Sequence, residues 1–295
     1  MYLKDPYTVS YKSISAVCDD NKEYVEIIEQ SNCYGGSAWA KYHYSKSPLV
    51  ISSRAIGNTI RYLVKTGVSD YFLKPSYLAA GIESVLVKGD EIEITYIGLG
   101  GGGVGATTCR AYSKGVLRYF LTESGGSKSA KGTIVVPKLS RLLIGVDDTD
   151  SKEVGATWTL VHNIANTLDK EDTRYISHSI VQLYPVPAKT QNCVSTVVEF
   201  FINPKNKKKL LSDFKSMVSK YSVSQHTGMV AYSNFDAKIL KEYGQKCRQQ
   251  EITYEFAMET AKNSGVEVLI DGRGIIGALA AIPYFAQPEE AVILS

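Results

Sequence analysis

An apolar run that ends in three closely spaced aspartates is the stretch of this sequence with the most evident chemistry. Leu142 to Val146 is followed by Asp147, Asp148 and Asp150. Carboxylates packed at a strand end repel one another unless a cation lies between them, and oxygen ligands of this kind favour Mg²⁺. Because Mg²⁺ is usually held by carboxylates together with substrate phosphates, the three aspartates are predicted to be metal ligands and catalytic residues of nucleotide-phosphate chemistry. The alternative interpretation is a solvated acidic turn.

A glycine-bearing helix start follows the acidic run. Gly155, Ala156 and Thr157 precede an amphipathic stretch, so the first amides of that helix are free to attract a phosphate. The Thr157 hydroxyl either caps the helix or faces the phosphate. Metal carboxylates that face a helix N-terminus make a workable phosphoryl-transfer site. We therefore group Thr157 with the catalytic residues and expect Thr149, Ser151 and Gly155 to contact the nucleotide.

A second glycine-rich segment lies at residues 98–105. It has the spacing of a Walker A loop, but Ala106 stands where the lysine should follow, and no acidic residue is placed as a dinucleotide fold requires. Glycines still permit positive φ and close backbone approach to a ligand, so we expect a ligand-binding loop, with a mobile surface loop as the alternative. The glycines expected to contact the ligand are Gly101, Gly102, Gly103 and Gly105.

Two segments of the second half add cations and amides suited to phosphate. Lys189 and Asn192 lie on a short polar loop, residues 187–192, between two expected strands. Arg273 stands between two glycines just before an apolar helix, where it can reach a phosphate at little steric cost. We expect all three side chains to contact the nucleotide.

The composition limits the classes of protein that the chain can belong to. Its 295 residues are 44% hydrophobic and 21% charged, which is typical of a globular chain. The net charge of +3 is small for a nucleic-acid-binding protein. No apolar run reaches the roughly 20 residues of a membrane span, and the N-terminus carries no signal segment, so we expect a cytoplasmic protein without a membrane partner. Five scattered cysteines without a CxxC pair indicate reduced thiols.

Hydrophobic periodicity and turn residues predict an α+β protein of two α/β halves, residues 1–138 and 139–295. The polar segment 122–131 is expected to be a linker or an exposed loop between them. The first half is expected to contain helices at 22–30, 53–65 and 106–121 and a hairpin of strands 83–88 and 91–97. An Asp150–Glu153 capping box is expected to start the helix at 154–168, with Trp158 on its inner face. The remaining second-half elements are strands at 141–146, 175–184, 193–202, 228–232 and 266–270, and helices at 205–221, 237–248, 253–263 and 275–281.

The second half resembles the archaeal agmatidine synthetases, which join agmatine to a tRNA cytidine. The matching motifs are GVDDTDS at 145–151, the Thr157 helix start, the Lys189-Thr190 loop, TGMV at 227–230 and GRGIIGALAAI at 272–282. The resemblance implies a kinase-like, ferredoxin-like half that binds ATP and Mg²⁺ through the aspartates. It also implies that Thr157 falls where that family carries an autophosphorylated threonine.

The whole chain also resembles the methanogenesis marker protein 11 family, which is associated with methane-producing archaea. The agmatidine synthetases hold tRNA with an OB fold and a zinc ribbon, and because the sequence contains no CxxC pair we do not expect these domains here. Together with the small net charge, this leads us not to expect tRNA as a partner.

The resulting prediction is an ATP- and Mg²⁺-dependent phosphoryl-transfer or ligase-type enzyme linked to methanogenesis. ATP and an unidentified acceptor are its expected partners, and the sequence is also compatible with a homodimer. The alternative is a non-catalytic nucleotide-binding assembly or regulatory factor of the methanogenic machinery. We further expect the glycine segment 98–105 and the acidic run to converge on one site.

Overall fold

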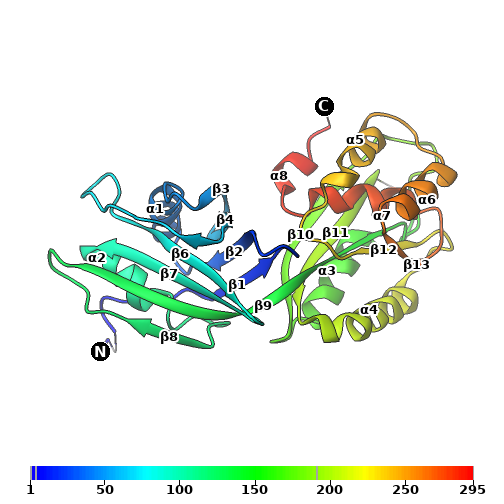
Figure 1. Cartoon of the computed structure of the whole chain (residues 1–295). Helices are drawn as coiled ribbons and strands as arrows, with labels where there is room; N and C mark the ends of the chain where they lie inside the picture. The colour runs from blue at the N-terminus through cyan, green and yellow to red at the C-terminus, as the bar shows by residue number, and fades with distance from the viewer. Residues whose placement is uncertain (1, 4, 191, 295) are drawn as a thin grey trace. The chain divides into compact units, whose positions relative to one another are not determined.

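The longest strand of the molecule, β9 (Ser129–Asp147), carries the acidic run at its carboxyl end. The computed structural model describes residues 2–3, 5–190 and 192–294 (Figure 1). The chain forms two compact units, Met1–Leu139 and Ser140–Ser295, and their boundary lies inside β9. Of the two interpretations of 122–131, the structure shows the exposed loop and not the linker, because Thr122 and Lys131 are hydrogen-bonded across the turn between β8 and β9. The polar and glycine-rich residues form a hairpin loop there.

The first unit is built on a mostly antiparallel sheet in the order β3-β4-β2-β1-β9-β7-β6-β5, with β8 also paired to β9. Only β1 and β9 are parallel among its described pairs. The strands are β1 (Ser13–Cys18), β2 (Tyr24–Gln30), β3 (Val50–Ile56), β4 (Thr59–Lys65), β5 (Gly67–Val68), β6 (Ala80–Lys88), β7 (Glu91–Leu99) and β8 (Arg118–Leu121). The helical segments are α1 (Tyr34–Tyr44), α2 (Gly100–Val104) and a π-helical turn at Gly105–Cys109.

Two helices expected in this unit are strands instead. The segment 22–30 forms β2, in which Val25 and Ile27 point into the core with the period of two that a strand requires. The segment 53–65 forms parts of β3 and β4, joined by a Gly57-Asn58 turn with φ of +57° at Gly57. A Gly-Asn pair between β-branched runs is a hairpin signal, and it outweighs the helical spacing of the same apolar residues.

The second unit is an antiparallel sheet between two layers of helices, in the order β10-β11-β9-β12-β13. This architecture confirms the expected α+β class. The strands are β10 (Thr173–Gln182), β11 (Val194–Ile202), β12 (Gly228–Tyr232) and β13 (Glu267–Ile270). The helices are α3 (Thr157–Thr167), α4 (Lys207–Tyr221), α5 (Lys241–Gln249), α6 (Tyr254–Asn263), α7 (Ile275–Ala281) and α8 (Pro288–Ala291).

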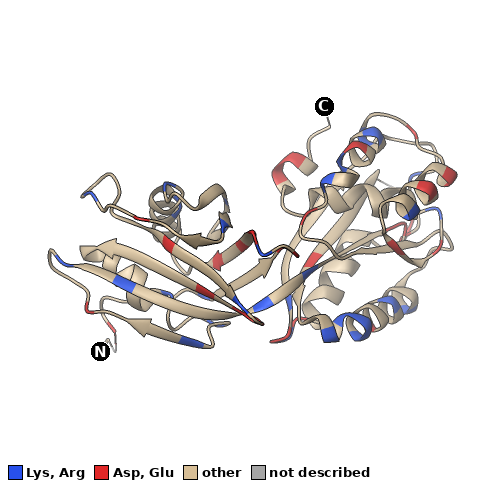
Figure 2. Cartoon of the chain, in the orientation of Figure 1, with Lys and Arg blue, Asp and Glu red and all other residues tan. Residues whose placement is uncertain are grey.

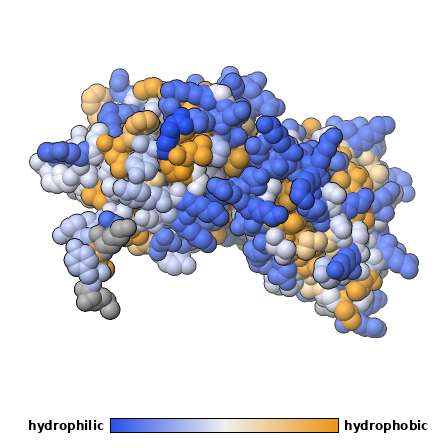
Figure 3. Space-filling view, turned by 90° about the horizontal axis from the view of Figure 1, so that it is seen from below, coloured by the Kyte–Doolittle hydropathy of each residue, from blue (hydrophilic) through white to orange (hydrophobic). Residues whose placement is uncertain are grey.

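Side chains along β9 point alternately to the two faces of the sheet, and this divides the core of the second unit into two layers. Leu142 and Ile144 face α3 and α4, whereas Leu143 packs with the small residues of α7 and with α5 and α6 (Figure 1). On the face shown in Figure 3, hydrophobic residues are interspersed with hydrophilic ones. In the described part of the chain, no helix is long and apolar enough to cross a membrane.

The glycine-rich segment of the first unit is helical rather than a loop. Residues 100–104 form α2, and the helix expected at 106–121 is replaced by the π-helical turn and β8. Gly98 lies so close to α2 that a Cβ on it would be 2.4 Å from the carbonyl carbon of Gly102. Gly102 and Gly103 are themselves buried. The glycines therefore allow a short helix to pack directly on β7.

We expect Gly102→Ala to lower the free energy of unfolding by about 1–3 kcal/mol, as overpacking typically does. Its Cβ would lie 2.8 Å from the Trp39 ring and 3.0 Å from the Ala79 carbonyl oxygen. Gly101→Ala in the same helix is the matched control, because no atom lies within 4 Å of its added Cβ. It should raise stability by roughly 0.5–1 kcal/mol through helix propensity. Urea unfolding measures both, and equal effects of the two changes would contradict the packing role.

Candidate functional site

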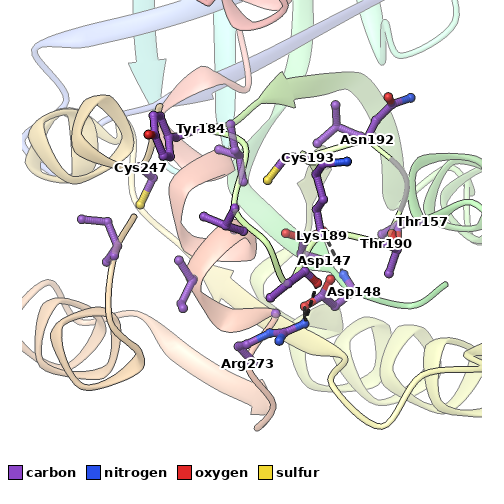
Figure 4. Close-up of a pocket in the computed structure, with 18 of the residues that line it drawn as sticks. Asp147, Asp148, Thr157, Tyr184, Lys189, Thr190, Asn192, Cys193, Cys247 and Arg273 are labelled. Atoms are coloured by element: carbon purple, nitrogen blue, oxygen red, sulfur yellow. Dashed lines mark hydrogen bonds and ion pairs between the residues drawn. The ribbon is translucent and has the colours of Figure 1, made fainter. Parts of the chain in front are cut away.

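A cavity of the second unit has a volume of about 360 Å³ and lies at the end of the sheet where β9 and β10 stop and β11 begins. One end is polar and contains the acidic run. The opposite flank is largely apolar. The polar lining comprises Asp147, Asp148, Asp150, Thr157, Lys189, Thr190, Asn192 and Arg273, and the apolar flank includes Leu183, Tyr184, Val186, Cys247, Ile252, Tyr254 and Ile276 (Figure 4).

The Asp147 carboxylate is held in place by its own loop and by α7. Its Oδ1 accepts a 2.8 Å hydrogen bond from the Asp148 amide, and Asp148 adopts a left-handed φ of +55° at the sharp turn after β9. Its Oδ2 lies where a side chain on Gly277 would begin, because a Cβ there would be 1.8 Å away. Any larger residue at position 277 would displace this carboxylate, so the glycine is part of how the site is built.

The other motif glycines have the same packing function. A Cβ on Gly145 of β9 would be 2.1 Å from the Ala278 carbonyl oxygen, and one on Gly228 of β12 would be 2.0 Å from the Ile275 amide. A Cβ on Gly272 would be 2.4 Å from the Thr227 carbonyl oxygen. The motif glycines at 145, 228 and 272 thus bring α7 and its preceding loop into backbone contact with the strands that carry the aspartates.

Each aspartate of the acidic run has a different partner. The Arg273 guanidinium lies 3.4 Å from Asp148 Oδ2 and donates to the Ala188 carbonyl oxygen at 3.2 Å. The Asp150 carboxylate accepts a 3.0 Å hydrogen bond from the Thr190 hydroxyl. Burial and the neighbouring Asp148 carboxylate raise the pKa of Asp147 well above its usual range, and burial raises the pKa of Asp148 against the lowering effect of Arg273. Negative charge is thus crowded at Asp147 and only partly offset.

These residues are better suited to bind a metal ion that is already coordinated by phosphates than to form a complete metal site from protein ligands alone. In the part of the chain that the structure describes, no group of three or more His, Cys, Asp or Glu side chains is arranged to hold a metal. A magnesium site built from one or two carboxylates plus phosphate oxygens needs no such group. The crowded Asp147 and Asp148 pair meets that requirement, while the ligand role of Asp150 stays a prediction.

Thr157 connects the acidic loop to α3. Its hydroxyl oxygen is buried and accepts hydrogen bonds from the Thr149 amide at 3.1 Å and from the Thr149 hydroxyl at 3.0 Å. A hydroxyl has two acceptor sites, so both are in use. The expected capping box is wrong, because Ala156 is the N-cap without a side-chain bond and the Asp150 carboxylate turns to Thr190. Thr157 therefore positions the loop, and its phosphorylation stays a prediction.

The structure brings most, but not all, of the expected site residues together. The four expected catalytic residues and Lys189, Asn192 and Arg273 line the cavity. Thr149 is buried beneath the loop, the Ser151 hydroxyl accepts from the Val154 amide, and Gly155 provides a turn with φ of +98°; these three are absent from the described lining. Gln191 lies outside the described residues. Gly101, Gly102, Gly103 and Gly105 belong to the first unit, and their convergence with the acidic run stays a prediction.

The apolar flank of the cavity was not predicted, because no residue type in it signals chemistry. Ile252, between α5 and α6, Tyr254 at the start of α6 and Cys247 of α5 provide its apolar surface, next to the polar residues Gln250, Glu251 and Thr253. Burial raises the pKa of Cys247 to about 12 and also raises the pKa of Cys193, so neither thiol is activated as a nucleophile. An apolar chamber next to charged groups is the usual form of a small-molecule site.

A stack of rings adjoins the cavity beside Thr157. The Trp158 ring lies parallel to His178 within 25°, with centroids 6.4 Å apart, and His178 lies parallel to His162 within 23° at 5.6 Å. Because the Thr196 hydroxyl donates to the Ser179 carbonyl, the His178 Nε2 bonded to that hydroxyl must be the donor. Trp158 is 43% exposed, so its expected place on the inner face of the helix is wrong.

Comparison with known proteins assigns the chain to a family. It is 41% identical over 282 residues to the uncharacterized protein MJ0921 of Methanocaldococcus jannaschii, a match that covers 93% of this chain and 94% of that protein. The chain belongs to the family of MJ0921. The resemblance to methanogenesis marker protein 11 stays a prediction.

The second unit is similar to part of a tRNA-modifying enzyme. Residues 143–203 match the TiaS TCKD domain. The tRNA 2-agmatinylcytidine synthetase TiaS of Pyrococcus horikoshii is 28% identical over 151 residues, which are 48% of this chain and 35% of that protein. The crystal structure of TiaS in complex with its tRNA and ATP aligns at 22% identity with a TM-score of 0.44, over 49% of this chain and 36% of that one. The chain thus spans about a third of the length of TiaS. The predicted resemblance of the second half to agmatidine synthetase is confirmed.

These matches contradict the expectation that tRNA is not a partner, since the similar enzyme modifies tRNA. The expectation was wrong because net charge is an average over the whole chain. Locally, α4 is strongly basic, as the Lys and Arg residues along it in Figure 2 show. It carries Lys207, Lys208, Lys209, Lys215 and Lys220 against the single acid Asp213.

We expect Thr157→Val to lower the free energy of unfolding by about 1–3 kcal/mol, because the buried Thr149 amide and hydroxyl lose their acceptor. Thr157→Ser keeps the oxygen and should cost much less. Thr159→Val, an exposed change on the same helix, is the control and should stay within about 0.5 kcal/mol. Urea unfolding of the three variants tests this, and a silent Thr157→Val would rule out the positioning role.

His178 should make stability depend on pH in the mildly acidic range. Burial lowers the pKa of His178 from 6.5 to about 4, and His162 acts in the same direction. Between these values the unfolded chain binds more protons than the folded one, so stability is lost as pH falls from about 6.5 through about 4. His178→Phe should flatten this dependence in chemical unfolding measured across that range. Trp158→Phe, which keeps the histidine, should leave it unchanged; equal slopes in His178→Phe and the wild type would refute the assignment.

Proposed function

We propose that the second unit binds Mg·ATP and transfers a phosphoryl group to an oxygen of an acceptor. The observation that carries the proposal is the cavity itself, in which Asp147, Asp148, Lys189 and Arg273 converge at one end and an apolar flank lies at the other. An ATP molecule has the same division between a charged triphosphate and a flat base. The sequence similarity to TiaS, an enzyme that has been crystallised with tRNA and ATP, supports this assignment.

The proposed orientation follows from the charges. The adenine lies in the flank formed by Tyr184, Ile252 and Tyr254, and the phosphates extend toward the acidic run. Magnesium, held by Asp147 and Asp148, would neutralise charge on the phosphates. Arg273 is already paired to Asp148 and can turn its remaining donors to a phosphate oxygen. In the transfer, the bond from the γ-phosphorus to its bridging oxygen breaks as the bond to the acceptor oxygen forms.

RNA is the acceptor class that the surroundings of the site favour. The C-terminal end of α4 adjoins the acidic loop, because the Val223 amide donates to the Thr149 carbonyl oxygen at 3.0 Å. Lys220 lies in the last turn of α4, at this end of the helix, and can contact the phosphates of a nucleic acid bound beside the acidic loop. The name of TiaS, a tRNA 2-agmatinylcytidine synthetase, supports the same class. A link to methanogenesis rests on the resemblance to marker protein 11 alone, and a nucleotide-binding assembly factor remains the alternative function.

Calorimetric titration with a non-hydrolysable ATP analogue tests the proposal. We expect binding that is lost with EDTA, and Asp147→Asn and Asp148→Asn should each weaken it about tenfold or more, the effect of losing one charge-assisted contact. Glu259→Gln, an exposed acid on α6, is the control and should bind as the wild type does. Binding that is the same in all variants would contradict the proposed site. ATP turnover that depends on added RNA would separate an enzyme from an assembly factor.

A further inference from the structure

We propose that Trp158 is a stacking platform that binds a planar ring of the acceptor beside the phosphoryl-transfer site. The residue lines the cavity directly next to Thr157, yet 43% of its surface is exposed. An exposed tryptophan that borders a functional cavity is a natural site for stacking, because every nucleobase has a π-face. This inference rests on the proposed function and specifies its acceptor.

The ring is supported on one side. His178 lies under Trp158 at an interplanar angle of 25°, and His162 continues the stack. His178 is tied to Thr196, while His162 is bonded to the Tyr175 hydroxyl at 2.9 Å and to the Asn166 side chain at 2.8 Å. These bonds come from α3, β10 and β11, so the platform rests on regular elements and not on a loop. A supported ring loses little conformational entropy when a second ring stacks on it.

The location of the platform matches what a transfer reaction needs. In Figure 4, Thr157 and Thr190 lie on one side of the group formed by Asp147, Asp148 and Arg273, and Tyr184 and Cys247 lie on the other. A nucleotide base in the Tyr184 flank leaves the Thr157 side for the acceptor. In-line displacement requires the acceptor oxygen and the leaving group on opposite sides of the phosphorus. Trp158 is therefore on the side from which an acceptor approaches.

The tryptophan content makes a direct measurement feasible. The chain has two tryptophans, Trp158 and Trp39, the latter in α1 of the first unit. In a Trp39→Phe background, Trp158 alone reports by fluorescence. The probes are cytidine and adenosine monophosphates and single-stranded oligocytidine and oligoadenosine, each titrated with and without a saturating Mg-bound non-hydrolysable ATP analogue. We expect saturable quenching. A response to the monophosphates indicates that a free ring suffices, and a response to the oligonucleotides alone indicates a base within RNA.

Two variants separate stacking from general packing. Because these variants lack the reporter ring, calorimetry measures their binding of the responding probe, and Trp158→Leu should weaken it by about 5- to 100-fold, the range for loss of one base stack. Trp158→Phe keeps a flat ring and should stay within a few-fold of the wild type. Calorimetry of the ATP analogue should give the same affinity in both variants, because the nucleotide lies on the other flank.

Three results would overturn the inference. These are the absence of quenching by any probe, equal losses in the Leu and Phe variants, and a loss of affinity for the ATP analogue in Trp158→Leu. Failure of the proposed function can be distinguished from failure of this inference. If the proposed function is wrong, the wild type does not bind the ATP analogue, whereas the fluorescence titration without analogue still measures probe binding at Trp158. Thermal unfolding monitored by circular dichroism confirms that each variant is folded before it is scored.

Discussion

The second unit depends on one close contact, the packing of α7 directly against β9 and β12. Gly145 and Gly228 have no side chains in the path of the α7 backbone, and Gly277 leaves room for the Asp147 carboxylate. Because α7 lies this close to the sheet, Arg273 at its preceding loop reaches Asp148. A bulkier residue at any of these glycines would separate the cation from the acids. The geometry of the site therefore follows from the absence of three side chains.

This contact places like charges close together, and the surrounding bonds make the arrangement tolerable. Burying a carboxylate next to another is costly unless each is paired or hydrogen-bonded. Asp148 has Arg273, Asp150 has Thr190, and the loop itself is fastened to α3 through Thr157. Among the described residues, only the amide of its neighbour donates to the Asp147 carboxylate. The residual repulsion there is what a divalent cation would relieve, and it is the physical basis of the proposed affinity for Mg·phosphate.

The sequence predicts the second unit well because local pattern and tertiary environment agree there. Strand 228–232 and helix 275–281 were predicted with the observed bounds, and the hairpin around Gly89-Asp90 was identified in the first unit. The helices predicted at 22–30 and 53–65 were wrong because the apolar residues there fit both the helical and the strand period. Only pairing with neighbouring strands decides between the two structures. The aspartates were identifiable from the sequence as candidate catalytic residues, whereas Ile252 and Tyr254 of the apolar flank are ordinary residues that gain a role only through their proximity to the site.

The two glycine-rich regions show why motif glycines alone cannot reveal a ligand site. In the first unit, Gly98 lets α2 pack on β7, just as Gly145 lets α7 pack on β9 in the second. The shared sequence VGAT, at 104–107 and 154–157, reflects no shared structure: the first copy spans the end of α2 and the start of a π-helical turn, and the second is a loop that leads into α3. Close packing of a helix on a strand is thus the common property. In the second unit this packing also brings carboxylates and an arginine together at a cavity, and these charged groups are the basis of the proposed nucleotide chemistry.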